Sequence, residues 1–96
     1  MEEDLRELWT TMKPTALARC ELIERAASTG DVASFDEARA DAHRLAGALG
    51  MYGLDEASDL AIRLDQLVVD GALADGRRDD VAALARALHE AVEDER

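Results

Sequence analysis

The chain has 96 residues, and we expect residues 1–96 to form a single domain with a modest core. Apolar residues, most of them alanine and leucine, make up 48% of the chain and aromatic residues only 3%, so the composition predicts an all-α fold. The formal net charge of −11 repels phosphate backbones and anionic lipids, so we expect neither nucleic acid nor membranes as partners.

Apolar residues spaced three and four apart predict a first helix over residues 2–28. Pro14 lies within this segment, lacks a backbone N–H and clashes with the preceding helical turn. We therefore expect either a kink at Pro14 or two separate helices, over residues 2–12 and 14–28. Gly30 follows the segment and suits a left-handed cap at the end of the helix.

A second helix is predicted over residues 34–52 from its apolar stripe. Ser34 is a good N-cap residue, and Glu37 lies three residues further on, at the spacing of a capping box. Asp31 is a competing cap for an earlier turn. We expect Gly53 to end this helix, because glycine readily adopts the left-handed conformation found there.

The same amphipathic spacing predicts a third helix over residues 55–69 and a fourth over residues 79–93. A polar connection that contains glycine, residues 70–78, separates them. Four amphipathic helices with short connections predict an antiparallel four-helix bundle, with an N-terminal helix kinked or split at Pro14.

His43 lies inside the second helical pattern and is followed by an unusual number of glycines, at positions 47, 50 and 53. Glycine costs about 1 kcal/mol relative to alanine in a helix interior, so these positions need a reason. Either Gly47 and Gly50 let a neighbouring helix pack tightly, or they lower the helix surface so that a second protein can reach the imidazole. In the second case the docking face comprises Ala40, Ala46, Gly47 and Gly50, with small neighbours such as Ala57 and Ala61 on the adjoining helix.

The segment AHRLAGALGMYGLDEASDLAIRLDQLV resembles the signature of the histidine-containing phosphotransfer (Hpt) domain family. That motif has a histidine, a leucine two residues on, a glycine four residues on and a second glycine ten residues on. The corresponding residues here are His43, Leu45, Gly47 and Gly53. The next helix of the family carries regularly spaced leucines, as do positions 60, 64 and 67 of this chain.

The resemblance implies a helical bundle with an exposed histidine on its second main helix. It also implies that His43 accepts a phosphoryl group from a receiver-domain aspartate or a histidine kinase, on the ring nitrogen farther from the backbone, and passes it on. Mg²⁺ is expected on the receiver, and we expect no cofactor or metal on this chain. The chain contains no nucleotide-binding glycine loop, so we expect a phosphocarrier without autokinase activity rather than a true enzyme.

One position departs from the family pattern. Family members often carry a lysine three residues after the histidine, which attracts the phosphoryl group, where this chain has Ala46. Three consequences are open: transfer is slower, Arg44 or Arg39 takes over the attraction, or the domain has lost phosphotransfer. An alternative function is a non-catalytic module that docks a receiver or kinase without carrying phosphate. A further one is the substrate domain of a chemotaxis-type histidine kinase. The candidate docking and supporting residues are Arg39, Ala40, Arg44, Ala46, Gly47 and Gly50.

Three other residues are assigned structural roles. His89 matches no motif, and we expect it to lie on the fourth helix either in solvent or at the boundary between the core and the surface. Cys20 is expected to be a small buried residue; as a lone cysteine it predicts no internal disulfide, no zinc site and a cytoplasmic protein. Trp9 is expected to anchor helix packing, or alternatively to mark a self-association patch.

Overall fold

A computed structural model describes residues 3–95, which form helices and the short connections between them, with Glu95 after the last helix. The elements are α1 (Glu3–Thr29), the 3-10 turn η1 (Val32–Ser34), α2 (Phe35–Leu49), the 3-10 turn η2 (Gly50–Tyr52), α3 (Asp55–Val69) and α4 (Arg78–Asp94). Four α-helices and no strand over this range confirm the all-α prediction. No helix in the described part of the chain combines the length and the apolar character needed to cross a membrane.

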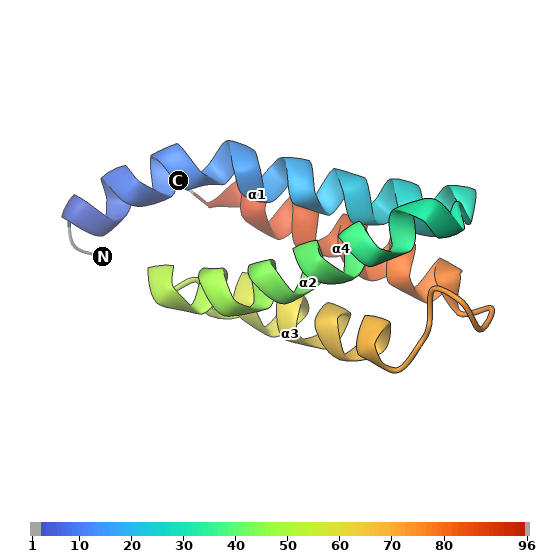
Figure 1. Ribbon diagram of the computed structural model, residues 1–96. Helices are drawn as coiled ribbons and strands as arrows, with labels where there is room; N and C mark the ends of the chain where they lie inside the picture. The colour runs from blue at the N-terminus through green and yellow to red at the C-terminus, as the bar shows by residue number, and fades with distance from the viewer. Residues whose placement is uncertain (1–2, 96) are drawn as a thin grey trace.

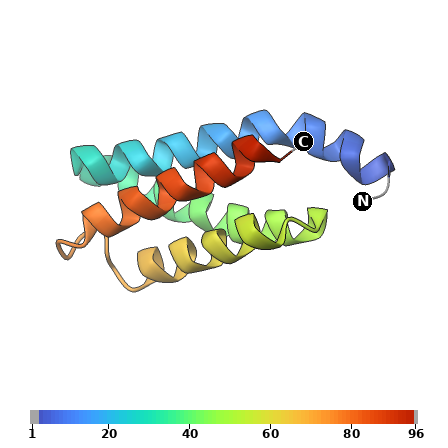
Figure 2. The same cartoon turned by 180° about the vertical axis from the view of Figure 1, so that it is seen from behind.

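The helices form an elongated bundle of 42 × 19 × 19 Å in which each helix runs opposite to the one before it (Figure 1). α1 lies beside α4, and α2 lies beside α3, as the view from behind also shows (Figure 2). α1 also packs on α2, and α3 packs on α4, so the four helices enclose one core. This is the antiparallel bundle expected from four amphipathic segments joined by short connections.

α1 continues through Pro14 without a break, so the expectation of two helices over residues 2–12 and 14–28 is wrong. Pro14 is exposed, and a proline on the solvent side of a long helix costs one backbone hydrogen bond without disturbing the buried face. Packing of that face along α2 and α4 holds the two halves of α1 together. A kink at Pro14 stays a prediction.

The start of α2 differs from the predicted capping box. Ser34 has helical backbone angles and makes no side-chain cap bond. Asp31 is the N-cap instead: its carboxylate accepts the backbone N–H of Ala33 at 3.1 Å and the hydroxyl of Ser34 at 3.1 Å. The competing cap therefore prevails, because it adds the turn Val32–Ser34 ahead of the α-helix proper.

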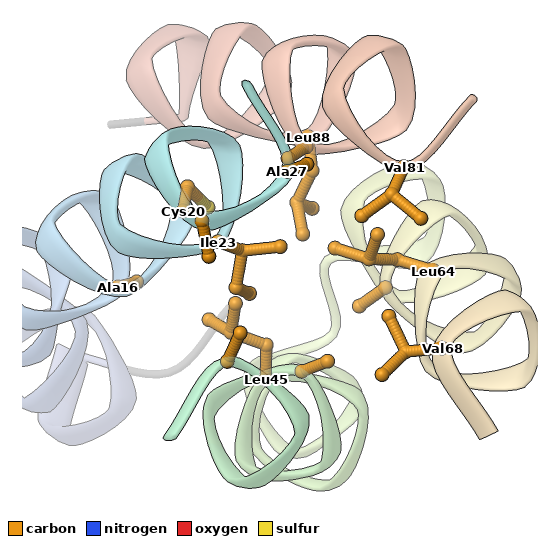
Figure 3. Packing of buried hydrophobic residues seen from close by; sticks show 14 of the residues in the cluster. Ala16, Cys20, Ile23, Ala27, Leu45, Leu64, Val68, Val81 and Leu88 are labelled. Atoms are coloured by element: carbon orange, nitrogen blue, oxygen red, sulfur yellow. The ribbon is translucent and has the colours of Figure 1, made fainter. Parts of the chain in front are cut away.

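The core is built largely from alanine and medium-sized aliphatic side chains that point inward from all four helices. Figure 3 shows the central set of these side chains facing one another across the bundle axis. Alanine at many of the contacts allows the helix backbones to approach closely, and leucine, isoleucine and valine fill the space between them. The labelled residues are Ala16, Cys20, Ile23, Ala27, Leu45, Leu64, Val68, Val81 and Leu88.

The turn between α2 and α3 sets how these two helices face each other. Gly53 has φ of 72°, the left-handed conformation expected at the end of a helix, and it reverses the chain within a few residues. Trp9 of α1 is fully buried beside this turn, and its ring centroid lies 5.3 Å from that of Tyr52. The expectation that Trp9 anchors helix packing is therefore confirmed.

Candidate functional site

His43 lies in the middle of α2 with 82% of its side chain exposed, on the helix face that points away from the core. The buried residues of α2 next to it in sequence, Ala42 and Leu45, point inward and have no exposed surface. The amphipathic pattern of α2 thus places the imidazole at the surface, because Ala42 and Leu45 direct the apolar face of the helix toward the core.

A carboxylate from the neighbouring helix reaches the histidine. Nδ1 of His43 lies 3.5 Å from Oδ2 of Asp65 on α3, at the long end of hydrogen-bond distance. Gly50 lies seven residues after His43 on α2, and it faces Ser58, which lies seven residues before Asp65 on α3. Asp65 is only 21% exposed, so packing between α2 and α3 holds the carboxylate on this side of the imidazole.

The position of Asp65 decides which ring nitrogen is available. A carboxylate accepts hydrogen bonds, so it favours the neutral tautomer that carries the proton on Nδ1. In that tautomer Nε2, the nitrogen farther from the backbone, has a free lone pair. The lone pair faces solvent because the side chain is mostly exposed. The arrangement can therefore deliver a nucleophilic nitrogen to a reagent that approaches from outside.

The surface next to His43 carries only small residues and no protruding side chain. Gly47 is exposed, and a Cβ added there would meet no other atom within 4 Å. Tight packing of a neighbouring helix therefore does not explain Gly47. Gly50 is also exposed, and its added Cβ would lie 3.3 Å from the Ser58 hydroxyl, which can rotate away. Ala40 and Ala46 are half-buried beside these glycines.

The adjoining helix contributes different residues from those expected. Ala57 and Ala61 have no exposed surface and belong to the core, so the prediction that they line the docking face is wrong. Asp65 is the α3 residue that reaches His43 instead, and Ile62 and Val69 lie three residues before and four residues after it, on the same side of α3. Ile62 is 43% exposed and Val69 74% exposed. Sequence reasoning missed both, because their exposure depends on how α3 is rotated against α2.

The two arginines next to His43 are each held by a carboxylate. Arg39 donates to Asp36 at 2.7 Å in an exposed pair. Arg44 donates to Oδ1 of Asp41 at 3.0 Å. Asp41 is buried, and Nε of Arg19 on α1 lies 3.7 Å from the same oxygen. An exposed ion pair contributes little and opens readily, so Arg39 is freer than Arg44 to turn toward a bound anion.

Two other groups are unsuited to the same chemistry. His89 is 22% exposed and has carboxylates at both ring nitrogens, Glu93 at 2.7 Å and Glu21 at 3.3 Å. Burial, and secondly the charge of Glu21, raises the pKa of the Cys20 thiol to about 12, so the thiol stays protonated and unreactive at neutral pH. No group of three or more metal-ligating side chains occurs within the described residues.

The family comparison agrees with this geometry. The family model described as "Hpt domain" matches residues 7–96, which is nearly the whole chain and includes α1 from its second turn onward and the other three helices in full. No match was found among curated proteins or among solved structures. The chain therefore belongs to the Hpt domain family, whose members perform histidine phosphotransfer in the phosphorelays of two-component signalling, with receiver domains and kinases as partners.

Proposed function

We propose that this chain is a phosphocarrier in which Nε2 of His43 accepts a phosphoryl group from a receiver-domain aspartate, or from a kinase, and passes it on. The observation that carries the proposal is the pairing of an 82% exposed imidazole with Asp65 at its Nδ1, which leaves Nε2 open. The cytoplasmic location expected from the lone cysteine is part of the proposal.

The transfer step follows from the tautomer. The lone pair of Nε2 attacks the phosphorus atom, and the bond between phosphorus and the carboxylate oxygen of the receiver breaks. The receiver carboxylate leaves with that bonding pair, and the imidazole ring becomes cationic while it keeps its proton on Nδ1. Asp65 faces that proton and stabilises the positive charge that develops on the ring.

The remaining requirements of phosphoryl transfer are alignment and charge neutralisation. The low surface at Gly47 and Gly50 lets the receiver bring its phosphorylated aspartate close to the imidazole. We propose that the receiver holds the Mg²⁺ that neutralises the phosphoryl oxygens, and that Arg39 swings from Asp36 to assist. The return step uses the same geometry in reverse, which suits a carrier rather than a catalyst.

A second function is favoured by one observation. Ala46 stands where the family often has a lysine, and both nearby arginines are engaged by carboxylates. A docking module that binds a receiver or kinase without carrying phosphate would have no need of a cation at this position.

The deciding experiment measures the intact mass of the chain after incubation with phosphorylated receiver domains. We expect the wild type to gain one acid-labile phosphoryl group and His43→Gln to gain none. His89→Gln is the matched control and should behave as the wild type. Receiver binding without any mass gain would establish the docking module, and labelling of His43→Gln would contradict the assignment of the site.

A further inference from the structure

A surface cavity of about 560 Å³ is lined by residues of the α1–α2 connection, the start of α2, the α3–α4 connection and the start of α4. These segments lie at the same end of the bundle (Figure 1). Phe35 and Leu73 line it and are 5% and 1% exposed, so the inner part of the cavity is apolar. Val32, also part of the lining, is 76% exposed. The cavity is thus an apolar hollow that opens to the outside.

Two guanidinium groups border this apolar hollow. One belongs to Arg39, whose exposed partner Asp36 also lines the cavity. The other belongs to Arg78, the first residue of α4, whose guanidinium lies over Gly30 so closely that a Cβ there would overlap it. Arg78 forms no ion pair with any carboxylate of residues 5–95.

This combination has a definite chemical preference. Arginine presents a planar fork of N–H donors that matches a carboxylate, and an unpaired guanidinium next to apolar surface is the form in which such a bond is strongest. The lining holds two arginines and one aspartate, in a chain whose net charge is −11. The cavity therefore suits a carboxylate on an apolar stem, although most of the chain repels acidic groups.

The cavity is close enough to His43 to lie under the same partner. Arg39 precedes His43 by one helical turn, and Asp36 by two turns, which is about 10 Å along the helix axis. A standard interface covers about 800 Å² on each partner, equivalent to a disc of roughly 16 Å radius. A receiver centred on His43 would thus extend over the cavity.

We propose that this cavity is a second anchor point for the receiver docked at His43, and that Arg78 there takes an acidic side chain of that receiver. The inference rests on the proposed function and adds the chemistry by which a receiver is selected. Receivers with a glutamate or aspartate at the facing position bind, and receivers with a basic residue there are rejected.

The test makes charge reversals in this chain and measures the dissociation constant of each variant for one receiver. That receiver is the member of a purified panel that exchanges phosphate fastest with the wild-type chain. Arg78→Glu should raise the dissociation constant at least tenfold, as expected for an anchor ion pair at an interface. Arg25→Glu is the matched control: it makes the same charge change at an exposed position on α1, and should raise the constant less than threefold.

A second variant guards against misfolding of Arg78→Glu, because Arg78 also covers Gly30. Ala74→Glu introduces a carboxylate at an exposed position of the cavity lining and leaves both arginines in place. It should weaken receiver binding to a similar extent, and exchanging the facing receiver acid for arginine should restore binding to Arg78→Glu. Equal losses in Arg78→Glu and Arg25→Glu, or no loss in Ala74→Glu, would overturn the proposal.

Other outcomes separate this inference from the proposed function. If the wild type binds a receiver without gaining phosphate, the carrier function fails. The affinities of Arg78→Glu and Arg25→Glu for that receiver then still decide whether the cavity is an anchor point. If glutarate or inorganic phosphate fills the cavity without changing receiver affinity, the site serves a free anion and the anchor is wrong. If no receiver of the panel binds, both proposals are overturned.

Discussion

The two histidines of the chain lie on two different helix pairs and have opposite surroundings. His43, between α2 and α3, is 82% exposed and has one carboxylate at Nδ1. His89, between α1 and α4, is 22% exposed and has a carboxylate at each ring nitrogen. The α1–α4 pair is also joined by Arg86 and Glu24, 3.1 Å apart, and by Lys13, which donates to the carbonyls of Glu93 and Glu95 at the end of α4.

The difference shows what makes a surface histidine available for chemistry. Both rings lie beside an acidic side chain of a neighbouring helix, so a nearby carboxylate does not distinguish them. Only His43 keeps one nitrogen free, and only His43 has glycines beside it that leave room for another protein. His89 serves to join α1 to α4, whereas His43 is held in one orientation and otherwise left open.

The largest effect is expected from closing the surface beside His43. Gly47→Leu adds a bulky side chain where the surface is open, and we expect phosphotransfer from a receiver to fall about a hundredfold, since displacing the reacting groups by about 1 Å is enough for such a loss. Ala18→Leu, at an exposed position of α1, is the control and should leave transfer unchanged. Stopped-flow transfer rates together with helicity by circular dichroism measure both. Undiminished transfer in Gly47→Leu would refute the role given to this glycine.

A smaller loss is expected when His43 loses the carboxylate at its Nδ1 while His89 keeps its own. Asp65→Ala should slow transfer roughly tenfold or more, as with other groups that orient a reactive imidazole. The ¹⁵N shifts of the His43 ring should also change, from the tautomer protonated on Nδ1 to a mixture. Asp59→Ala, elsewhere on α3, is the control. A slower transfer with an unchanged tautomer would contradict the positioning role of Asp65.

A gain of function is expected at the position of the missing lysine. Ala46→Lys places an ammonium group one turn from His43, and we expect transfer to rise about three- to tenfold through attraction to the phosphoryl oxygens. Ala46 is half-buried, and a lysine there can bury its stem and extend its charged end to solvent. Ala83→Lys, at an exposed position of α4, is the control because it adds the same charge away from His43. The transfer rates of both variants are measured at two salt concentrations. An equal gain in both variants would attribute the effect to net charge alone.

The smallest effect is expected at the other histidine. His89→Gln loses at least one of the two contacts that the ring makes with Glu21 and Glu93, and we expect the free energy of unfolding to fall by about 0.5–1 kcal/mol. Urea denaturation of this variant and of His43→Gln makes the comparison, with His43→Gln expected to be closer to the wild type. A larger loss in His43→Gln would mean that the exposed histidine has the greater structural role.

Much of the fold follows from local pattern alone. The bounds of α3, residues 55–69, were predicted to the residue, because acidic residues favour the first turn and Asp70 with Gly71 ends the apolar stripe. The spacing from His43 to Gly47 and Gly53 likewise identifies the family without coordinates. Predictions that depended on competing local bonds were less secure, as the cap at Asp31 shows.

The sequence by itself therefore determined four amphipathic helices and an outward-facing histidine beside glycine, since both depend on residues within a few turns of each other. Tertiary structure alone decided that Asp65, far from His43 along the chain, supplies the partner of Nδ1. It also decided that Ala57 and Ala61 are buried while Ile62 and Val69 are exposed. The physical reason is that periodicity identifies the apolar face of each helix, but the rotation and register between two helices depend on how their side chains fit together.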